Sequence, residues 1–314
     1  MITEMSEQTT QTNIQERLSF WQKILKLLSN KKQVQLLILL VFVSLDIFIW
    51  TVVFRIDRQG ELTVVFLDIG QGDAIYIEAP NGNQILIDGG PSGGVLLRKL
   101  SQVMPFFDRS IDIILATHPD QDHVGGLPMV IDRMDVDGVV TTENTSETGA
   151  HTAFENSIRE KKLYRILARA GERIILDDGI VLEIFFPNQS TVGWETNTGS
   201  IVGRLSYGNK SFLFTGDSPQ GVEKYLAINK GRALRTTVLK LGHHGSRTSS
   251  TREFISAVDP DYAIISAGKN NTYGHPHKEV TELLETLKIS TISTIDHGTI
   301  IFKTDGEELR IINN

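Results

Sequence analysis

The sequence feature that most constrains this chain is the apolar run Leu36–Phe54. Only three of its nineteen residues are polar, namely Ser44, Asp46 and Thr51. A helix needs about 20 apolar residues to cross about 30 Å of hydrocarbon, whereas the apolar part of a cleaved signal peptide has about 7–15 residues and ends in small residues. Because this run is longer and continues directly into Arg55, we predict one uncleaved transmembrane helix.

Charged residues on the two sides of the run predict its orientation. Four lysines precede the run and two arginines follow it. The positive-inside rule then predicts a single-pass protein of the cell membrane, with a cytoplasmic N-terminus and an extracytoplasmic main body. Asp46, near the middle of the run, costs about 2.5–3.5 kcal/mol on insertion scales. It either contacts a membrane-protein partner or is tolerated as a partly snorkelled carboxylate, and both alternatives stay open.

The chain divides into a predicted polar tail (1–35), the transmembrane helix (36–54), a linker (55–61) and a globular domain (62–314). In the tail, Leu18–Leu28 has the spacing of an amphipathic stretch that lies on the membrane surface. The chain has no cysteine, which excludes disulfides and thiolate ligands, so any metal must be held by His, Asp, Glu or Asn.

The charge of the chain is also unevenly distributed. Of 31 basic and 38 acidic residues, seven and five lie in residues 1–58, which leaves a net charge of −9 for the remainder. An acidic body is not typical of a protein that coats nucleic acid. It is still compatible with a local basic groove or with a metal that binds phosphate.

The globular domain is predicted to be rich in strands, with helices between them. Short apolar runs bounded by Gly, Pro or Asn are typical of strands, and Asn81-Gly82 and Gly208-Asn209 are typical of hairpin turns. Each predicted hairpin is followed by a short phrase of Gly and Asp. This similarity is explained either by an internal duplication or by two unrelated hairpins of a common type. The predicted strands are Leu62–Leu67, Ala74–Glu78, Gln84–Ile87, Ile111–Ala116, Val181–Phe186, Ser200–Ser206, Ser211–Phe214, Thr236–Leu241, Tyr262–Ser266 and Thr299–Lys303. The predicted helices are Leu96–Met104, Ala153–Lys162, Gly221–Asn229, Thr251–Val258 with Thr251 as its cap, and Glu279–Leu287.

The densest group of potential metal ligands follows the predicted strand Ile111–Ala116. His118, Asp120, Asp122 and His123 lie within six residues, just before a glycine pair and a helix predicted to start near Leu127. Polar groups at the end of a buried strand are costly unless something pairs them, and a divalent cation would do so. A polar turn with capping aspartates is the alternative, but the density of this run favours a metal.

Three later segments hold further candidates. Asp217 ends the apolar strand phrase FLFTGD, where a lone aspartate is more often a turn or cap residue. His243 and His244 follow a strand in LKLGHHGS, and neighbouring strand residues point to opposite faces, so one of the two is expected to join a given metal. His275 lies in the loop NTYGHPH, which by itself is more typical of a surface loop.

Taken together, the phrases HxDxDHxGG, FTGD, LKxxHHGS and NxYGHP resemble the metallo-β-lactamase superfamily, in the branch of the C-terminal hydrolase domain of ComEC DNA-uptake competence proteins. The phrases Phe66–Ala74 and Leu86–Gly90 also fit that branch. The resemblance covers residues 61–314 and does not include a many-helix channel region. It implies an α/β (α+β) fold, a four-layer αβ/βα sandwich, here preceded by the transmembrane helix.

The resemblance also implies a site for two divalent metal ions. The implied first-metal ligands are His118 and Asp120, and the implied second-metal ligands are Asp122, His123 and His243, with Asp217 bridging the ions. His244 is the adjacent alternative to His243. The wider superfamily has histidines where Asp120 and Asn197 stand here, so the site is richer in oxygen and both zinc and manganese are open.

Several residues beside the implied ligands have roles that stay open. Asp122 is expected to orient the attacking water, and His275 to donate a hydrogen bond to a phosphate or a leaving oxygen. His244 is counted with them as a catalytic candidate. Asp73 and Asp88 either fix ligand histidines or cap tight turns.

The function implied is a nuclease or phosphodiesterase that acts on DNA, or on another phosphodiester, through a water activated by two metals. A lactonase or β-lactamase is an alternative that Asp120 and Asn197 disfavour. A non-catalytic DNA-binding component of an uptake system is a second alternative, which the full ligand set disfavours. The run Arg159–Arg173 is interpreted as an exposed helix with a following loop rather than a DNA path. Candidate phosphate-binding cations are Lys240, Arg247, Arg252, Lys269 and Lys278.

Overall fold

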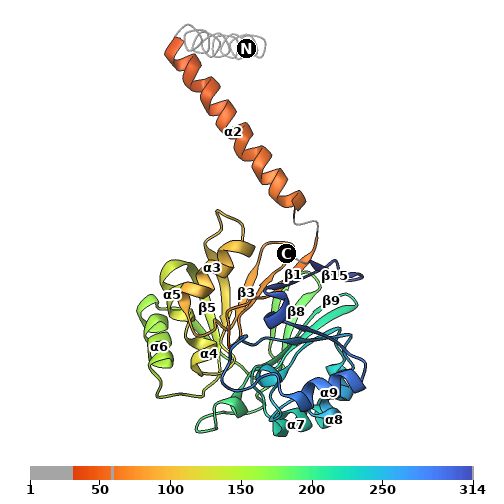
Figure 1. Ribbon diagram of the computed structural model, residues 1–314. Coiled ribbons are helices and arrows are strands. Elements are labelled where there is room, and N and C mark those ends of the chain that lie inside the picture. The colour runs from red at the N-terminus through yellow and green to blue at the C-terminus, as the bar shows by residue number, and fades with distance from the viewer. Residues whose placement is uncertain (1–30, 58–59, 313–314) are drawn as a thin grey trace, which may run out of the picture. The chain divides into compact units, whose positions relative to one another are not determined.

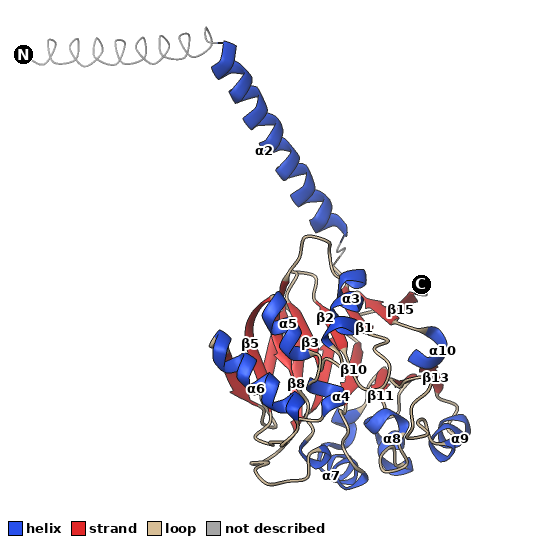
Figure 2. Ribbon diagram, turned by 60° about the vertical axis from the view of Figure 1, so that its left-hand side comes forward, coloured by secondary structure: helices blue, strands red, loops and turns tan. Residues whose placement is uncertain are grey.

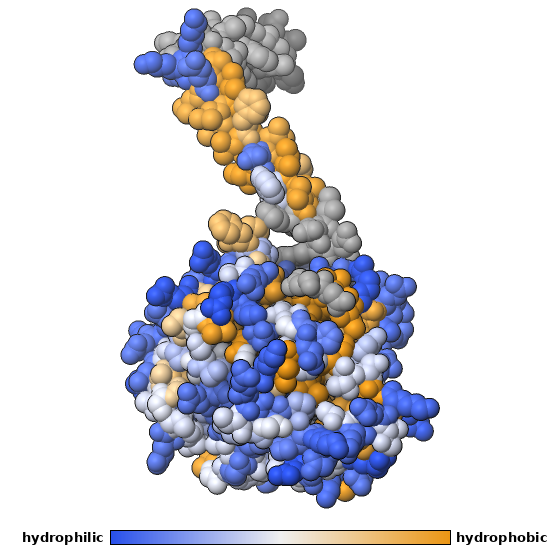
Figure 3. All heavy atoms as spheres, viewed as in Figure 1, coloured by the Kyte–Doolittle hydropathy of each residue, from blue (hydrophilic) through white to orange (hydrophobic). Residues whose placement is uncertain are grey.

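The computed structural model describes residues 31–57 and 60–312, and the chain separates into two compact units, 1–59 and 60–314. In the first unit, helix α2 (Lys31–Asp57) is long and apolar enough to cross a membrane. Figure 3 shows the apolar side chains that cover it. The helix extends the predicted span at both ends, so the first three residues of the predicted linker are helical. The predicted amphipathic stretch Leu18–Leu28 lies outside the described residues.

The second unit contains two sheets. The eight-stranded sheet has the order β15-β14-β1-β2-β3-β4-β5-β6, with β3 to β6 parallel. Its strands are β1 (Leu62–Phe66), β2 (Ile75–Glu78), β3 (Gln84–Ile87), β4 (Ser110–Leu115), β5 (Asp135–Thr141), β6 (Tyr164–Leu167), β14 (Ile300–Thr304) and β15 (Leu309–Ile312).

The seven-stranded sheet has the order β13-β12-β11-β10-β9-β8-β7, with β10 to β13 parallel. Its strands are β7 (Arg173–Asp177), β8 (Ile180–Phe186), β9 (Val202–Tyr207), β10 (Lys210–Phe214), β11 (Val238–Lys240), β12 (Tyr262–Ile265) and β13 (Ser290–Ser293). Both predicted hairpins form, and in each sheet the hairpin is followed by a parallel strand. The two hairpins, which share a Gly/Asp phrase in the sequence, therefore also share a local topology.

Three apolar cores hold the layers together. Alternate residues of a strand point to opposite faces, so Val64 and Phe66 of β1 lie in the core between the sheets, whereas Val65 faces the helices on the other side. The outer cores join α3 and α5 to the first sheet, and α7 and α8 to the second. Figures 1 and 2 show the resulting order of helices, sheet, sheet and helices. This confirms the predicted four-layer sandwich.

The helices of the second unit pack by their apolar faces, such as Leu96 and Leu100 of α3 and Val222 and Leu226 of α7. The predicted cap is present, because the Phe254 N–H donates to the Thr251 hydroxyl. The helices are α3 (Gly93–Val103), α4 (Gln121–Val124), α5 (Leu127–Arg133), α6 (Gly149–Lys161), α7 (Gln220–Lys230), α8 (Arg252–Val258), α9 (Lys278–Thr286) and α10 (Thr294–His297), with 3-10 turns η1 (Asn197–Gly199), η2 (Gly231–Leu234) and η3 (Gly242–Gly245).

Five strands were missing from the sequence prediction: β5, β6, β7, β13 and β15. β5 begins Asp-Val-Asp-Gly and so lacks an apolar run, and only its last four residues are buried. β6 and β15 have no fully buried residue, and β7 has only one, Leu176. Their strand character comes from pairing with a neighbour, which local hydropathy does not record.

Candidate metal centre

The candidate site lies where the strands of both sheets end. Asp88 follows β3 and His118 follows β4, while Asp217 follows β10 and His244 follows β11. Parallel strands end at the same edge of a sheet, so each sheet collects its polar loops there. A backbone bond from Ile201 N–H to Thr117 O (3.0 Å) joins the two sheets at this edge.

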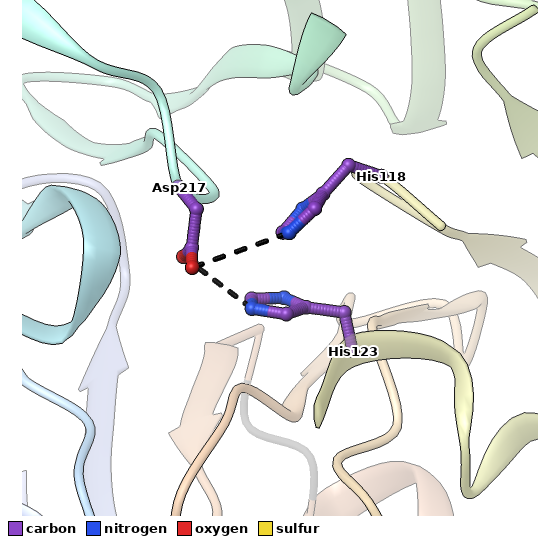
Figure 4. A group of neighbouring side chains, drawn as sticks. All are labelled: His118, His123 and Asp217. Carbon is purple, nitrogen blue, oxygen red and sulfur yellow. Dashed lines mark ion pairs between the residues drawn. The ribbon is translucent and has the colours of Figure 1, made fainter. Parts of the chain in front are cut away.

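His118, His123 and Asp217 form the centre of the cluster. Figure 4 shows the two imidazoles and the carboxylate pointing toward one another from different segments. His123 Nε2 lies 3.3 Å from Asp217 Oδ1, and His118 Nε2 lies 4.0 Å from Asp217 Oδ2. All three residues are buried.

Asp122, His123 and His244 form a second group that shares His123 with the first. His244 Nε2 lies 3.3 Å from Asp122 Oδ2 and 3.4 Å from Asp217 Oδ2. The rings of His123 and His244 stack with centroids 5.3 Å apart. In each group the potential ligand atoms lie within 4.8 Å of one another. The two groups adjoin through His123 and Asp217.

His243 and His244 do not lie on a strand. Both adopt left-handed backbone conformations in η3, with φ of 49° and 55°. The prediction that they alternate across a strand is therefore wrong, because the chain turns immediately after β11. His244 is 1% exposed, whereas the side chain of His243 is 27% exposed and its Nε2 lies 3.8 Å from Asp217 Oδ2. The geometry thus favours His244 over His243 as the histidine of the second group.

Asp120 lies at the edge of the cluster, with Oδ2 3.7 Å from His118 Nε2 and its side chain 34% exposed. Burial raises the pKa of Asp120, and Thr196, the neighbour of Asn197, opposes this increase. Asn197 begins η1, and its Oδ1 is buried without a hydrogen-bond partner among the described residues.

The donor atoms of the cluster fit metal ions. His118 Nε2, His123 Nε2, His244 Nε2 and Asp217 Oδ1 are buried and lack hydrogen-bond partners in the described part of the chain. Buried polar atoms are ordinarily paired, so four orphaned atoms turned toward one space need another partner. Imidazole and carboxylate are ligands for zinc and manganese. The set therefore fits divalent cations, and the chemistry of its atoms does not select between these metals.

Asp88 fixes the orientation of His123. Its Oδ2 lies 2.8 Å from His123 Nδ1, while Thr117 donates to Asp88 through both its N–H and its hydroxyl. The Thr117 hydroxyl also lies 3.0 Å from His118 Nδ1. These contacts leave the Nε2 atoms facing the cluster, which is how carboxylates usually orient ligand histidines. Sequence reasoning missed Thr117, although its place before His118 was the available signal.

Lys240 is not a surface cation that binds phosphate, which corrects the sequence interpretation. It is 1% exposed, forms an ion pair with Asp73 and donates to Gly216 O (3.1 Å). Asp73 also lies 3.5 Å from His244 Nδ1, and its N–H donates to Asp122 O (3.2 Å). A lysine inside the apolar strand VLKL was the sequence signal for a buried ion pair.

A close backbone contact supports the same arrangement. Gly72 has a φ of +114°, and a Cβ there would lie 2.0 Å from Asp122 O. Only glycine allows this approach of the segment before β2 to the ligand loop.

The charges of the cluster shift its pKa values in opposite directions. Burial lowers the pKa of His244, but Asp217 and Asp73 outweigh it and raise the pKa to about 9. Burial and His123 lower the pKa of His118 to about 3. Burial raises the pKa of Asp217, yet His244 and His123 hold it well below its usual value. Protons on His244 and His123 thus balance the carboxylates, and a cation would have to displace them.

His275 joins the rim of the site. It is 8% exposed, and its ring lies 5.3 Å from that of His243 and 6.1 Å from that of His244. Burial and the neighbouring histidines lower its pKa to about 4, so it is neutral at pH 7. The side chain of Asn271 holds the backbone of His275, because it donates to His275 O (2.7 Å) and accepts from His275 N–H (2.9 Å).

Most predicted cationic candidates lie on the surface, and several are paired. Arg247 pairs with Glu279 and Lys278 with Glu282, while Arg252 and Lys269 are exposed. In the basic run, Arg165 pairs with Glu155 and Arg169 with Glu143. The run forms the end of α6 and then β6, so a strand replaces part of the expected loop. These pairs are consistent with a solvated surface.

The sandwich and the site at its sheet edges define a class of protein. The chain belongs to the Metallo-beta-lactamase superfamily, whose sequence profile matches residues 67–269. Within that class it is similar to ComE operon protein 3 of Bacillus subtilis (29% identity, 79% of this chain and 33% of the relative). It is also similar to Recombination protein 2 of Haemophilus influenzae (31%, 74% and 28%) and to Competence protein ComA of Neisseria gonorrhoeae (28%, 78% and 32%). The chain thus spans about a third of the length of these curated relatives.

Among solved structures, the fold is similar to that of CmlA, a diiron β-hydroxylase from Streptomyces venezuelae. The TM-score is 0.52 at 14% identity, with 81% of this chain and 54% of that chain covered. This likeness shows the fold alone. The superfamily and its fold suggest a metal-dependent hydrolase, and the reaction must be argued from the residues of the site.

Proposed function

We propose that this protein is a membrane-anchored, metal-dependent phosphodiesterase that cleaves DNA on the extracytoplasmic side of the membrane. The observation that carries the proposal is the buried cluster of orphaned imidazole and carboxylate atoms described above. The relatives named for competence and recombination support DNA as the substrate class. The apolar helix α2 and the lysines before it support the anchor and its orientation.

Two divalent cations, zinc or manganese, are proposed at the cluster. His118 and Asp120 would hold the first ion, Asp122, His123 and His244 the second, and Asp217 would contact both. Five carboxylates and one ammonium give the cluster a formal charge of −4 when its histidines are neutral, which two divalent cations would offset. These charged residues are Asp73, Asp88, Asp120, Asp122, Asp217 and Lys240.

When bound, such cations activate water and neutralise phosphoryl oxygens. The residues of the chain supply the rest. Asp122 is 31% exposed, and nearby imidazole charge lowers its pKa against the effect of burial, so it stays ionised and can orient a water and accept its proton. His275 is neutral and can donate an N–H to a phosphoryl or leaving oxygen. Asp120 and His243 line the same open side.

The test is cleavage of single- and double-stranded DNA by the full chain in lipid nanodiscs, with manganese or zinc added to metal-free protein. We expect metal-dependent cleavage that Asp122→Asn slows by roughly 100-fold or more, as the loss of a positioned proton acceptor does. His297→Ala, an exposed histidine of α10, is the matched control and should cleave like wild type.

The alternatives give different results in the same assay. Salt-sensitive DNA binding that survives chelation, without cleavage under either metal, would support a DNA-binding component and overturn the proposal. Hydrolysis of lactones or β-lactams, with DNA left intact, would instead identify a different metallohydrolase.

A further inference from the structure

The loop between α3 and β4 presents two adjacent phenylalanines to solvent. Phe106 is 92% exposed and Phe107 is 56% exposed. Single exposed apolar side chains are common on soluble proteins. Two adjacent exposed phenylalanine rings place more apolar surface in water, and such clustered surface often marks an interaction site. The position of the loop in the fold indicates what it could contact.

The loop lies at the edge of the eight-stranded sheet where the second unit begins. Thr63 of β1 is opposite Glu78 of β2, which in turn is opposite Gln84 of β3. The Gln84 side chain donates to Asp108 Oδ2 (2.6 Å), two residues after Phe106. Neighbouring strands lie about 4.8 Å apart, so the loop is roughly 15 Å across the sheet from the start of β1. Figure 1 shows it projecting from the end of this unit at which β1 begins.

Only a short length of chain joins that edge to α2. Helix α2 ends at Asp57, and the second compact unit begins at Gly60. Three residues reach at most about 11 Å even when fully extended. If α2 crosses a membrane as proposed, this length of chain allows the start of β1 to reach the polar interface of the bilayer.

We propose that the Phe106-Phe107 loop inserts into the interfacial region of the bilayer that α2 crosses. Phenylalanine side chains gain free energy when they leave water for the boundary between headgroups and acyl chains. Arg109 and Arg133 line a recess of about 280 Å³ together with Phe106, and arginines at this depth can contact lipid phosphates. Asp132 lies beside Arg133, so aromatic insertion rather than net positive charge carries the proposal.

Insertion would also orient the metal centre. The Phe106-Phe107 loop lies at the starts of β3 and β4, whereas Asp88 and His118 follow the ends of these strands. The six residues of β4 span about 20 Å between the two sides. The inserted domain would therefore hold its site away from the membrane surface, open to a polymer that approaches from the aqueous side.

The absence of cysteine from the chain allows a direct test by single-cysteine labelling. Phe106→Cys, Val192→Cys and Leu45→Cys would each be labelled with an environment-sensitive fluorophore in the full chain, reconstituted into phosphatidylcholine vesicles that contain nitroxide lipids. Val192 is the matched control, because it is 70% exposed and lies in the loop between β8 and β9, at the end with the metal centre. Leu45 reports on α2 itself.

We expect blue-shifted emission and severalfold stronger lipid quenching at 106 than at 192, unchanged when the protein is diluted in lipid. Equal quenching at 106 and 192, with 45 quenched, would overturn the insertion and leave the anchor intact. Loss of quenching at 45 would overturn the anchor, and the insertion with it. A signal at 106 that disappears on dilution would identify a second copy of the chain as the occupant and also overturn the proposal.

Discussion

His243 and His244 are neighbours in the chain but lie in different environments. The left-handed turn after β11 buries His244 between Asp122 and Asp217, while His243 stays partly exposed. Neither the motif nor the expected strand alternation could assign the ligand, because the assignment depends on φ angles that hydropathy does not encode. The candidate metal-binding loop after β4 was easier to find, since its potential ligands are dense in sequence.

The two histidines can be separated by metal binding. We expect His244→Ala to weaken metal binding by at least about 100-fold, because it removes a buried donor atom, and His243→Ala to weaken it by less than about 10-fold. Isothermal titration with zinc and manganese measures both. The reverse order of effects would contradict the assignment of His244.

We expect the buried ion pair of Lys240 with Asp73 to stabilise the folded protein. Lys240→Met leaves Asp73 buried without its cation, and breaking a buried pair in this way costs about 3–5 kcal/mol. Denaturant unfolding of the metal-free protein measures the loss. The double variant Lys240→Met/Asp73→Asn should recover a large part of it, whereas additive losses would show that the ion pair is not the cause.

At the scale of elements, the hairpins and the helices with clear apolar faces were predictable, and the edge strands were not. β6 and β7 are defined by a paired neighbour rather than by a run of apolar residues. Helices α7 and α8 also meet at a contact that the sequence does not reveal. Glu223 of α7 is buried and accepts from the N–H groups of Ser250 (2.6 Å) and Thr251 (2.8 Å) at the start of α8.

Glu223 predicts a pH dependence of stability. Burial raises its pKa from 4.5 to about 7 despite the two backbone hydrogen bonds. Between these values the folded state holds a proton that the unfolded state has lost, so the contribution is present below about pH 4.5 and is lost as pH rises through 7, up to about 3 kcal/mol.

Glu223→Gln should therefore gain stability relative to wild type between pH 5 and pH 8, as measured by denaturant unfolding. Glu253→Gln on the exposed face of α8 controls for general charge effects. A difference between Glu223→Gln and wild type that does not change with pH would contradict a raised pKa.

Asp46 is the one charged residue within the apolar run Leu36–Phe54 of α2. We expect Asp46→Leu to favour membrane insertion by about 3 kcal/mol, because a carboxylate at the helix centre is costly. A glycosylation-based insertion assay measures this. Loss of crosslinking between chains in the same variant would favour the partner-contact interpretation of Asp46 over a merely tolerated carboxylate.

At the scale of the whole molecule, the metal centre joins the two sheets. His118 and His123 come from the first sheet, and Asp217 and His244 from the second. A bound cation would therefore connect the two halves of the sandwich directly, beyond their shared apolar core.

Metal removal should consequently destabilise the domain. At a metal concentration of 100 times Kd, binding to the folded state contributes about 2.7 kcal/mol, which corresponds to a Tm change of roughly 5–10 °C for a domain of this size. Differential scanning calorimetry with and without chelator measures the change, with His244→Ala as the control that should respond much less. An unchanged Tm in wild type would contradict metal binding at this cluster.

The sequence by itself determined the apolar helix and the dense run of potential metal ligands, because each is a local pattern of residue types, and its motifs indicated the sandwich through their resemblance to a known family. The tertiary structure decided that His244 rather than His243 is buried beside Asp122 and Asp217, that Lys240 is a buried partner of Asp73, and that Asn271 holds the His275 backbone. It also placed the Phe106 loop at the edge where the domain begins. These features depend on segments far apart in the chain meeting at one sheet edge, and that meeting is fixed by strand pairing and core packing rather than by neighbouring residues.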